Sequence, residues 1–142
     1  MKNNKLVMSL VIMLGIVILA AAAAVFFLMR GQAEGGPKEP GIDEVLESSV
    51  DVEEITANLA TDDYIRVSFK IQTDSKKAKE ELEKRDFQTR NVIIYELSEK
   101  KAEDLQGKDG KLLLEDTIKD KLNGVMQEGK VVKVYITEAL LQ

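Results

Sequence analysis

Apolar residues dominate the first part of the chain, where Leu6 to Met29 form a run of 24 residues interrupted only by Ser9 and Gly15. No charged residue falls within this run. At a rise of about 1.5 Å per residue, a helix of this length reaches roughly 36 Å, which exceeds a hydrocarbon core of about 30 Å. The run therefore predicts a transmembrane helix over residues 6–29, with some tilt in the bilayer.

A cleavable signal peptide is the alternative interpretation of this segment, because the small residues Ala20–Ala24 follow a basic start. A cleavage site should close the apolar segment, whereas here the apolar stretch Val25–Met29 comes after the alanines. The run is also longer than the apolar core of a typical signal peptide. We therefore expect the segment to be retained as an anchor.

The charges that flank the run predict its orientation. Lys2 and Lys5 precede it, whereas Arg30 and Lys38 on the other side are mixed with glutamates. Positive charge favours the cytoplasmic side of a membrane. We therefore expect residues 1–5 to form a short cytoplasmic N-terminus and the part beyond the span to be extracytoplasmic.

The composition changes again after the apolar run. The stretch Gly31–Gly41 contains four glycines and both prolines of the chain, and no aliphatic residue larger than Ala. Such a composition is typical of a solvated tether. We expect a flexible linker over residues 30–41 and one folded domain over residues 42–142.

Alternating residues predict a β-hairpin at the start of this domain. Apolar and polar side chains alternate with a period of two from Tyr64 to Ile71, which indicates a half-buried strand. A weaker alternation covers Val50–Val52 and Ile55–Leu59. The turn-prone residues Thr61–Asp63 join the two segments.

A helical period follows from Ser75 to about Glu99. Ala78, Leu82, Ile93 and Leu97 share one helical face, and Asp74 or Ser75 is a suitable N-cap. Three oppositely charged pairs have the favourable i,i+4 spacing, namely Glu80 with Lys84, Glu81 with Arg85, and Asp86 with Arg90. The pattern predicts one long amphipathic helix whose second half is the more buried.

The last part of the chain predicts a second helix and a third strand. After a break at residues 107–110, the spacing of Leu114, Ile118, Leu122 and Val125 indicates a helix that ends with Gly129 as its C′ residue. Residues 130–137 alternate again, with one face formed by Val132, Val134 and Ile136. The predicted fold class is α/β of the α+β type, in the order β-β-α-α-β.

The composition removes most catalytic chemistry. The chain has no His and no Cys, which excludes imidazole bases, thiolate nucleophiles and metal sites built from these ligands. The 102 residues from Gly41 to Gln142 carry 23 acidic and 16 basic side chains, a net charge of −7 that should repel nucleic acid and anionic lipid. We expect no catalytic residue, no cofactor and no metal.

Two local patterns oppose this expectation, one of a hydrolase and one of a calcium site. Ser98 and Lys101 match the S-x-x-K spacing of some hydrolases, but this lysine lies among glutamates and lacks the companion motifs. The window from Asp104 to Glu115 has the length of an EF-hand loop, but it has Lys108 at a ligand position and no glycine at the sharp turn. Solvated surface and a loop between helices are the better interpretations.

The order of several short motifs along the domain resembles the flagellar basal body-associated protein FliL family. They are Asn58-Leu59-Ala60 before YIRVSFKI, Arg90-Asn91-Val92-Ile93-Ile94, Leu97-Ser98, Gly110-Lys111, Asn123, Gly129 and the ending VVKVYITEALLQ, which contains Tyr135 and Thr137 and closes at Gln142. The resemblance covers the anchor and nearly all of the domain. Tyr64, the first residue of YIRVSFKI, belongs to the same set.

The resemblance implies a bacterial single-pass protein of the cell (inner) membrane, located at the flagellar basal body, with a periplasmic or extracytoplasmic domain of stomatin-type fold. It further implies a non-enzymatic, ring-like homo-oligomer around the motor stator that supports torque generation, swimming or swarming. Relatives often have an aromatic residue in place of Ala139 and an acidic residue in place of Asn91. The alternative function is a tethered extracytoplasmic binding or scaffold module unrelated to motility.

Overall fold

The computed structural model describes residues 3–31 and 38–142, and the chain divides into two compact units between Glu39 and Pro40. The predicted linker over 30–41 falls mainly on residues 32–37, which lie outside the described residues, as do residues 1–2 of the predicted cytoplasmic N-terminus. The two units are described separately below, the second as the C-terminal domain.

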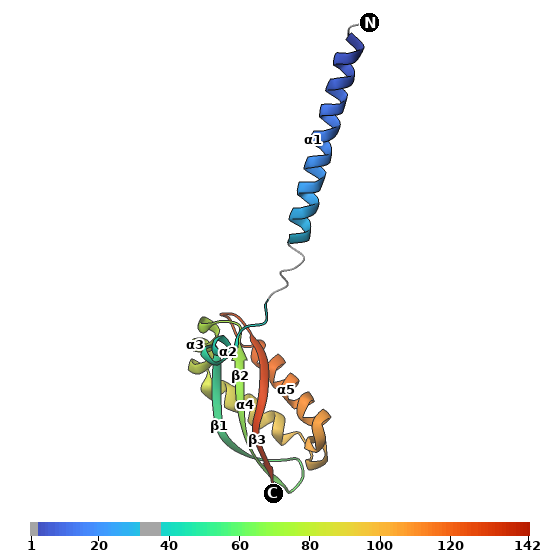
Figure 1. The fold of residues 1–142 in the computed structure, drawn as a ribbon. Coiled ribbons are helices and arrows are strands. Elements are labelled where there is room, and N and C mark those ends of the chain that lie inside the picture. Colours follow the sequence, from blue (N-terminus) through green and yellow to red (C-terminus); the bar gives the residue numbers. More distant parts are fainter. Residues whose placement is uncertain (1–2, 32–37) are drawn as a thin grey trace. The chain divides into compact units, whose positions relative to one another are not determined.

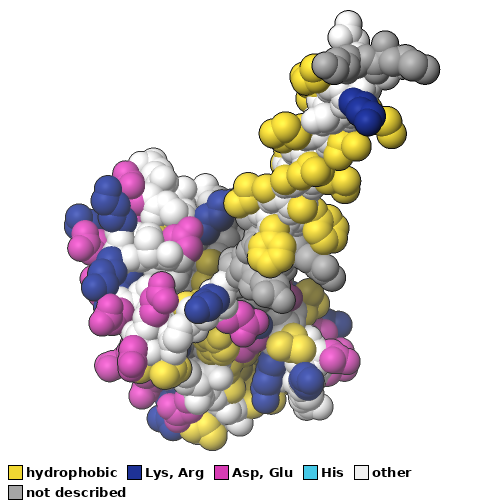
Figure 2. All heavy atoms as spheres, turned by 45° about the horizontal axis from the view of Figure 1, so that its top comes forward, with side chains coloured by type: hydrophobic (Ala, Val, Ile, Leu, Met, Phe, Trp, Pro, Cys, Tyr) yellow, Lys and Arg dark blue, Asp and Glu magenta, His cyan; other side chains and the backbone are white. Residues whose placement is uncertain are grey.

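The described part of the first unit contains one long helix, α1 (Asn3–Gly31), which extends beyond the predicted range at both ends. Its side chains from Asn3 to Met29 are all exposed. Hydrophobic side chains therefore form its surface, whereas acidic and basic side chains are interspersed over the visible face of the C-terminal domain (Figure 2). By length and composition, Asn3–Met29 is able to cross a membrane.

The C-terminal domain is a mixed α/β unit built on a three-stranded antiparallel sheet of order β1-β2-β3 (Figure 1). Its elements in chain order are α2 (Ile42–Glu47), β1 (Ser49–Asn58), β2 (Tyr64–Thr73), α3 (Lys76–Lys84), α4 (Asp86–Ser98), the 3₁₀ helix η1 (Ala102–Leu105), α5 (Gly107–Asn123) and β3 (Val131–Leu141). The predicted mixed class and the three strands are confirmed, and α2 and η1 are additions to the predicted order.

The predicted hairpin is confirmed, with a bulge in its first strand. Asn58 is paired with Tyr64 across the turn, which Leu59 closes by donating its N–H to the Asp63 carbonyl at 3.0 Å. The register shifts between Val52 and Ile55, where the two residues Glu53 and Glu54 lie opposite the single Ser68 of β2, so β1 has one extra residue. This bulge explains the weak alternation of β1, because it resets the phase and leaves both Val52 and Ile55 buried.

One face of the sheet carries the core, and the helices cover it. The buried apolar residues of β2 are Ile65, Val67, Phe69 and Ile71. The helices contribute Leu82, Ile93, Leu97, Leu114, Ile118 and Leu122 to the same cluster. The opposite face is polar and includes an ion pair of 2.6 Å between Lys70 Nζ and Asp51 Oδ1.

The predicted helix over residues 75–99 is two helices, which is a correction. Ser75 caps α3 by accepting the Ala78 N–H at 3.1 Å, and the chain leaves helical geometry at Arg85. The residues that follow, Asp86–Asn91, are mostly weak helix formers, so a continuous helix has little local support. The predicted burial of Ala78, Leu82, Ile93 and Leu97 is confirmed.

The predicted boundaries of the second helix are also wrong. α5 begins at Gly107, so the expected break at 107–110 is helical, and the true break is η1 with its flanking residues. α5 ends at Asn123 with Gly124 as its C-cap. Gly129 is therefore not the C′ residue, although its φ of +88° places it in the left-handed region that favours glycine, in the turn before β3.

The third strand is longer than predicted, and Val132 lies on the opposite face of the sheet from the predicted one. β3 extends to Leu141, and its register against β2 shifts between Gln72 and Thr73 and again between Ser68 and Phe69. The first shift leaves Val132 without a paired residue in β2. Val131 and Val134 are consequently buried and Val132 is exposed, contrary to the predicted alternation.

Candidate functional site: an apolar groove beside β3

The serine and lysine of the S-x-x-K pattern do not form a nucleophile and base. Ser98 Oγ donates to the Tyr95 carbonyl at 2.9 Å within α4. The exposed Lys101 has its Nζ atom 3.9 Å from a Glu103 carboxylate oxygen, so nothing desolvates the ammonium. The geometry offers no hydrolytic site here.

The two ends of the EF-hand-like window have separate structural partners. Asp104 Oδ2 accepts the Lys101 N–H at 2.8 Å, and Glu115 Oε1 accepts the Ile136 N–H of β3 at 2.8 Å. Within residues 3–31 and 38–142, no three His, Cys, Asp or Glu side chains are grouped so that they could hold a metal ion. These carboxylates support the backbone.

An apolar groove of about 260 Å³ opens where the end of the sheet meets η1 and the start of α5. Ala139 and Leu141 of β3 are paired with Val67 and Ile65, so they share the helix-covered face of the sheet. They are nevertheless exposed, because α5, which begins at Gly107, does not extend over this end of β3. The apolar lining consists mainly of Ile65, Val67, Leu105, Leu114, Ile136 and Leu141.

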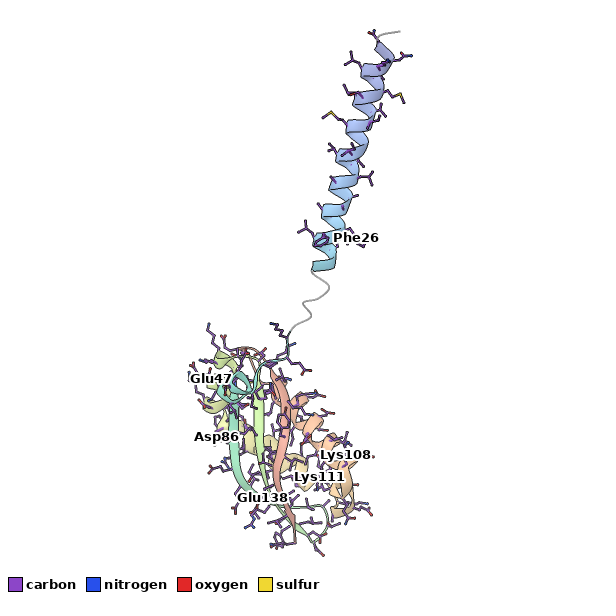
Figure 3. All side chains as sticks on the ribbon, in the orientation of Figure 1. Phe26, Glu47, Asp86, Lys108, Lys111 and Glu138 are labelled. Atoms are coloured by element: carbon purple, nitrogen blue, oxygen red, sulfur yellow. The ribbon has the colours of Figure 1, made fainter. Side chains whose placement is uncertain are left out.

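The groove continues into a second hollow of about 330 Å³ between α5 and β3, which shares Lys111, Ile136 and Ala139 with it. Lys108 and Lys111 project from the first turns of α5, and Glu138 from β3, on the same side of the domain (Figure 3). Lys111 is the charged residue that lines the apolar part. The site thus combines an apolar floor with a rim that carries ammonium groups.

A third hollow, of about 570 Å³, lies among α3, the start of α4 and the turn at 127–128. Glu81 accepts the backbone N–H groups of Gln127 at 3.0 Å and Glu128 at 2.6 Å, and the Arg85 Nε–H at 2.7 Å. The Glu128 amide contributes most to lowering the pKa of Glu81; partial burial opposes it, and the Gln127 amide and Arg85 lower the pKa further. Glu81 therefore fixes this turn onto α3.

Several of the residues that carry the family resemblance close the ends of elements. Tyr64 and Gln142 exchange both backbone hydrogen bonds at 2.8 Å, which ties the end of the chain to the start of β2 beside Asn58. The Asn123 side chain donates to the Val131 carbonyl at 2.9 Å and accepts the Val131 N–H at 2.8 Å. It therefore replaces a neighbouring strand at the start of β3.

The remaining residues of this set are spread over the domain. Arg90 joins the Asp86 carboxylate, at 3.1 Å, to the Glu53 carbonyl of β1, at 3.3 Å. Leu59 is buried and Asn91 is exposed. Gly110 lies close to the backbone of Asp104, and Gly129 lies close to the side chains of Asp74 and Ala78. The Tyr135 hydroxyl donates to Gln72 at 3.3 Å, and Thr137 lies at a register shift. Together they support the fold and do not converge on one site.

Sequence reasoning missed two features. One is the groove, which depends on where α5 starts. The other is an ion pair between the buried Glu96 and the exposed Lys121, in which Lys121 Nζ lies 2.8 Å from Glu96 Oε1, and this hydrogen bond raises the pKa of Lys121. The available signal was Glu96 itself, which shares the buried face of α4 with Ile93 and Leu97.

Comparison with known proteins identifies what this domain is similar to. A family model described as flagellar basal body-associated protein FliL matches residues 49–142, which is most of the C-terminal domain. The chain belongs to the FliL family. It is also 49% identical over 123 residues to the flagellar protein FliL of Bacillus subtilis (strain 168), a match that covers 87% of this chain and 88% of the relative.

Membership of the FliL family gives the chain a flagellar role at the basal body. FliL proteins are structural and accessory proteins and not a known enzyme family, in agreement with the structural use of Ser98 and Glu115 described above. The flagellar interpretation is therefore favoured over a tethered module unrelated to motility. The helix α1 adds a candidate membrane span to this assignment.

Proposed function

We propose that this protein is a single-pass accessory subunit of the flagellar motor whose C-terminal domains assemble into a ring-like homo-oligomer around the stator. In this proposal α1 anchors the chain in the bacterial cell membrane with its N-terminus in the cytoplasm. The C-terminal domain, of stomatin-type fold, is extracytoplasmic. The ring helps stator units to engage or remain active, and so supports torque generation and swimming or swarming motility.

The observation that carries the proposal is the FliL family match across residues 49–142, together with an N-terminal helix that is apolar on all sides. A helix with this surface is suited to lipid and unsuited to water. The visible surface of the C-terminal domain has the opposite character, because acidic and basic side chains are interspersed over it (Figure 2). One chain thus combines a membrane anchor with a domain that functions in water.

A ring made of copies of one chain requires a heterologous interface, in which two different faces of the domain are complementary. Confinement of the anchors to the membrane raises the local concentration of the domains, so weak contacts between neighbours suffice. Closure around the stator then gives many simultaneous contacts. The loss of one complementary face should consequently disperse the whole ring.

The test is to cross-link intact cells that carry a tagged copy, purify the bait from solubilised membranes and quantify stator subunits by mass spectrometry. We expect enrichment over an unrelated single-span protein. A matched control retains residues 30–142 and replaces 6–29 with an unrelated span, which separates recognition by the domain from recognition by the anchor. Absence of stator subunits despite good recovery of the bait would overturn the proposal.

A further inference from the structure

Helix α4 is apolar on two opposite sides. Ile93 and Leu97 are buried against the sheet, as in an ordinary amphipathic helix. On the outer side, Phe87 is 71% exposed, Ile94 41% and Tyr95 63%. These three residues, called the α4 ridge below, form an apolar surface that lies in water. A helix that is apolar on both sides is expected to be buried on both sides.

The surroundings of the α4 ridge are acidic on the side of β1. Asp86 precedes Phe87, and Arg90 ties Asp86 to the backbone of the β1 bulge, which carries the exposed Glu53 and Glu54. Since Arg90 is engaged with Asp86 and the Glu53 carbonyl, its charge is already shared. The ridge therefore has carboxylates along its β1 border, whereas on the α3 side Phe87 lines a hollow that also contains Lys84 and Arg85.

The groove beside β3 has the complementary properties. It is a hollow of about 260 Å³ with an apolar floor, and Lys111 lines it while Lys108 lies on the adjoining rim. No ion pair is formed by either lysine among the residues that the structure describes. On the ridge side, Asp86 is paired with Arg90 and Glu54 with Arg66, so Glu53 is the carboxylate of this border that forms no ion pair in the described part of the chain. Lys108, Lys111 and Glu53 are therefore available to a neighbouring molecule.

We propose that the α4 ridge of one copy docks into the β3 groove of the next copy. The two surfaces match in three respects: both are apolar, one projects where the other is hollow, and the border charges that form no ion pair include Lys108 and Lys111 beside the groove and Glu53 beside the ridge. Glu115 and Glu138 also line the adjoining hollow, and Glu115 is bonded to the Ile136 N–H. The occupant of the groove is thus a second copy of this chain. This inference rests on the proposed ring and identifies the two faces that form it.

The position of the two faces suits repeated addition of copies. Asp86 lies on the β1 side of the domain, whereas Lys108 and Lys111 lie on the α5 side (Figure 3). Because the ridge and the groove occupy different sides, each copy has one of each to offer to its two neighbours. Such a contact is heterologous and generates a ring where the rotation between copies closes.

Cysteine cross-linking tests this pairing directly, because the natural chain contains no cysteine. The full chain carrying both Ile94→Cys and Ala139→Cys is oxidised in native membranes and analysed on non-reducing gels. We expect a ladder of oligomers. Each single variant alone should remain monomeric, and co-expression of the two single variants should give a dimer only, since ridge pairs with groove and not with itself.

A background change then tests the contact itself. Phe87→Ala in the double-cysteine chain removes the centre of the ridge, and we expect roughly tenfold less cross-linked product, the effect of losing a modest interface anchor. Leu113→Ala is the matched control, because Leu113 is an exposed leucine of α5 outside both surfaces. It should leave the amount of product unchanged.

The same membranes treated with an amine-reactive cross-linker separate the two proposals. A ladder with this reagent, without a disulfide product between positions 94 and 139, overturns the interface and leaves the ring intact. Disulfide dimers from Ile94→Cys alone overturn it as well, because they show a two-fold contact. Monomers under both treatments overturn the ring and the interface together.

Discussion

Gly110→Ala should destabilise the C-terminal domain, although replacing a glycine by alanine inside a helix ordinarily stabilises that helix. In a helix interior alanine is favoured over glycine by about 1 kcal/mol. At Gly110, the fourth residue of α5, an added Cβ would overlap the backbone carbonyl of Asp104 in η1. Relieving this overlap requires η1 to move away from α5, because the obstructing atom belongs to the backbone.

The expected size follows from these two opposing effects. Overpacking costs about 1–3 kcal/mol, and the upper end applies where a backbone segment must shift. After subtraction of the gain in helix propensity, the net loss in the free energy of unfolding is roughly 2 kcal/mol. For a domain of about 100 residues, this lowers the melting temperature by roughly 8–16 °C.

The assay is urea unfolding of the full chain in detergent micelles, followed by tyrosine fluorescence. The chain has no Trp, and its three tyrosines, Tyr64, Tyr95 and Tyr135, all lie in the C-terminal domain, so the signal reports on that domain alone. Gly41→Ala is the control, because its Cβ would meet open space. A higher unfolding midpoint for Gly110→Ala would refute the close approach of η1 to α5.

Three further predictions concern side chains. Asn123→Ala should lower the free energy of unfolding by about 2 kcal/mol in the same urea assay, because it leaves both polar groups of Val131 unpaired. Asn123→Asp should also destabilise the domain, because it keeps the acceptor for the Val131 N–H but places a carboxylate oxygen against the Val131 carbonyl oxygen. Glu81 has a lowered pKa, so its contribution to stability is present above its ordinary pKa of 4.5 and is lost as the pH falls through the lowered value. The advantage of the natural chain over Glu81→Gln in unfolding midpoint should therefore shrink below pH 4.5; a constant difference at all pH values would contradict this. Ala139→Leu should fill part of the groove, raise the unfolding midpoint and reduce the oligomer ladder obtained with an amine-reactive cross-linker, whereas an unchanged ladder would show that the groove is not used for assembly.

Hydrophobic periodicity was sufficient where an element keeps one regular phase. β2 alternates without interruption from Tyr64 to Ile71 and is paired on both sides, so its prediction was accurate. The weak points were the irregularities of the edge strands. The bulge at Glu53 and Glu54 in β1 and the unpaired Val132 in β3 each change which residues of the strand face the core. A strict period-two pattern cannot predict such changes.

Glycine was the least reliable signal. Gly107 and Gly110 were interpreted as a break, but both lie in α5, and Gly110 is required by the backbone of a preceding element. The prediction of Gly129 as the C′ residue of the second helix is wrong, because its positive φ and its close approach to Asp74 and Ala78 serve a turn before β3. Both explanations depend on contacts between segments that are distant along the chain, which local patterns cannot reveal.

The candidate site shows the same division. The sequence places Ile65, Val67 and Leu114 of the groove on apolar faces, and these are buried. The groove itself exists because α5 starts at Gly107 and leaves Ala139 and Leu141 uncovered. The exposed Phe87 and Tyr95 were not singled out. The pattern that could have predicted them is the presence of apolar residues on the outer face of a helix whose inner face already carries enough apolar residues to pack on the core.

In the proposed ring, the bulge in β1 has a consequence for how long neighbouring copies stay together. Glu53 and Glu54 interrupt the hydrogen-bonding register of an edge strand and place two charges beside it. An edge of this kind resists pairing with a strand of another molecule. Crowded copies are thereby kept from merging their sheets into one irreversible structure. In the proposed ring, subunits held only by side-chain contacts are then able to leave and be replaced.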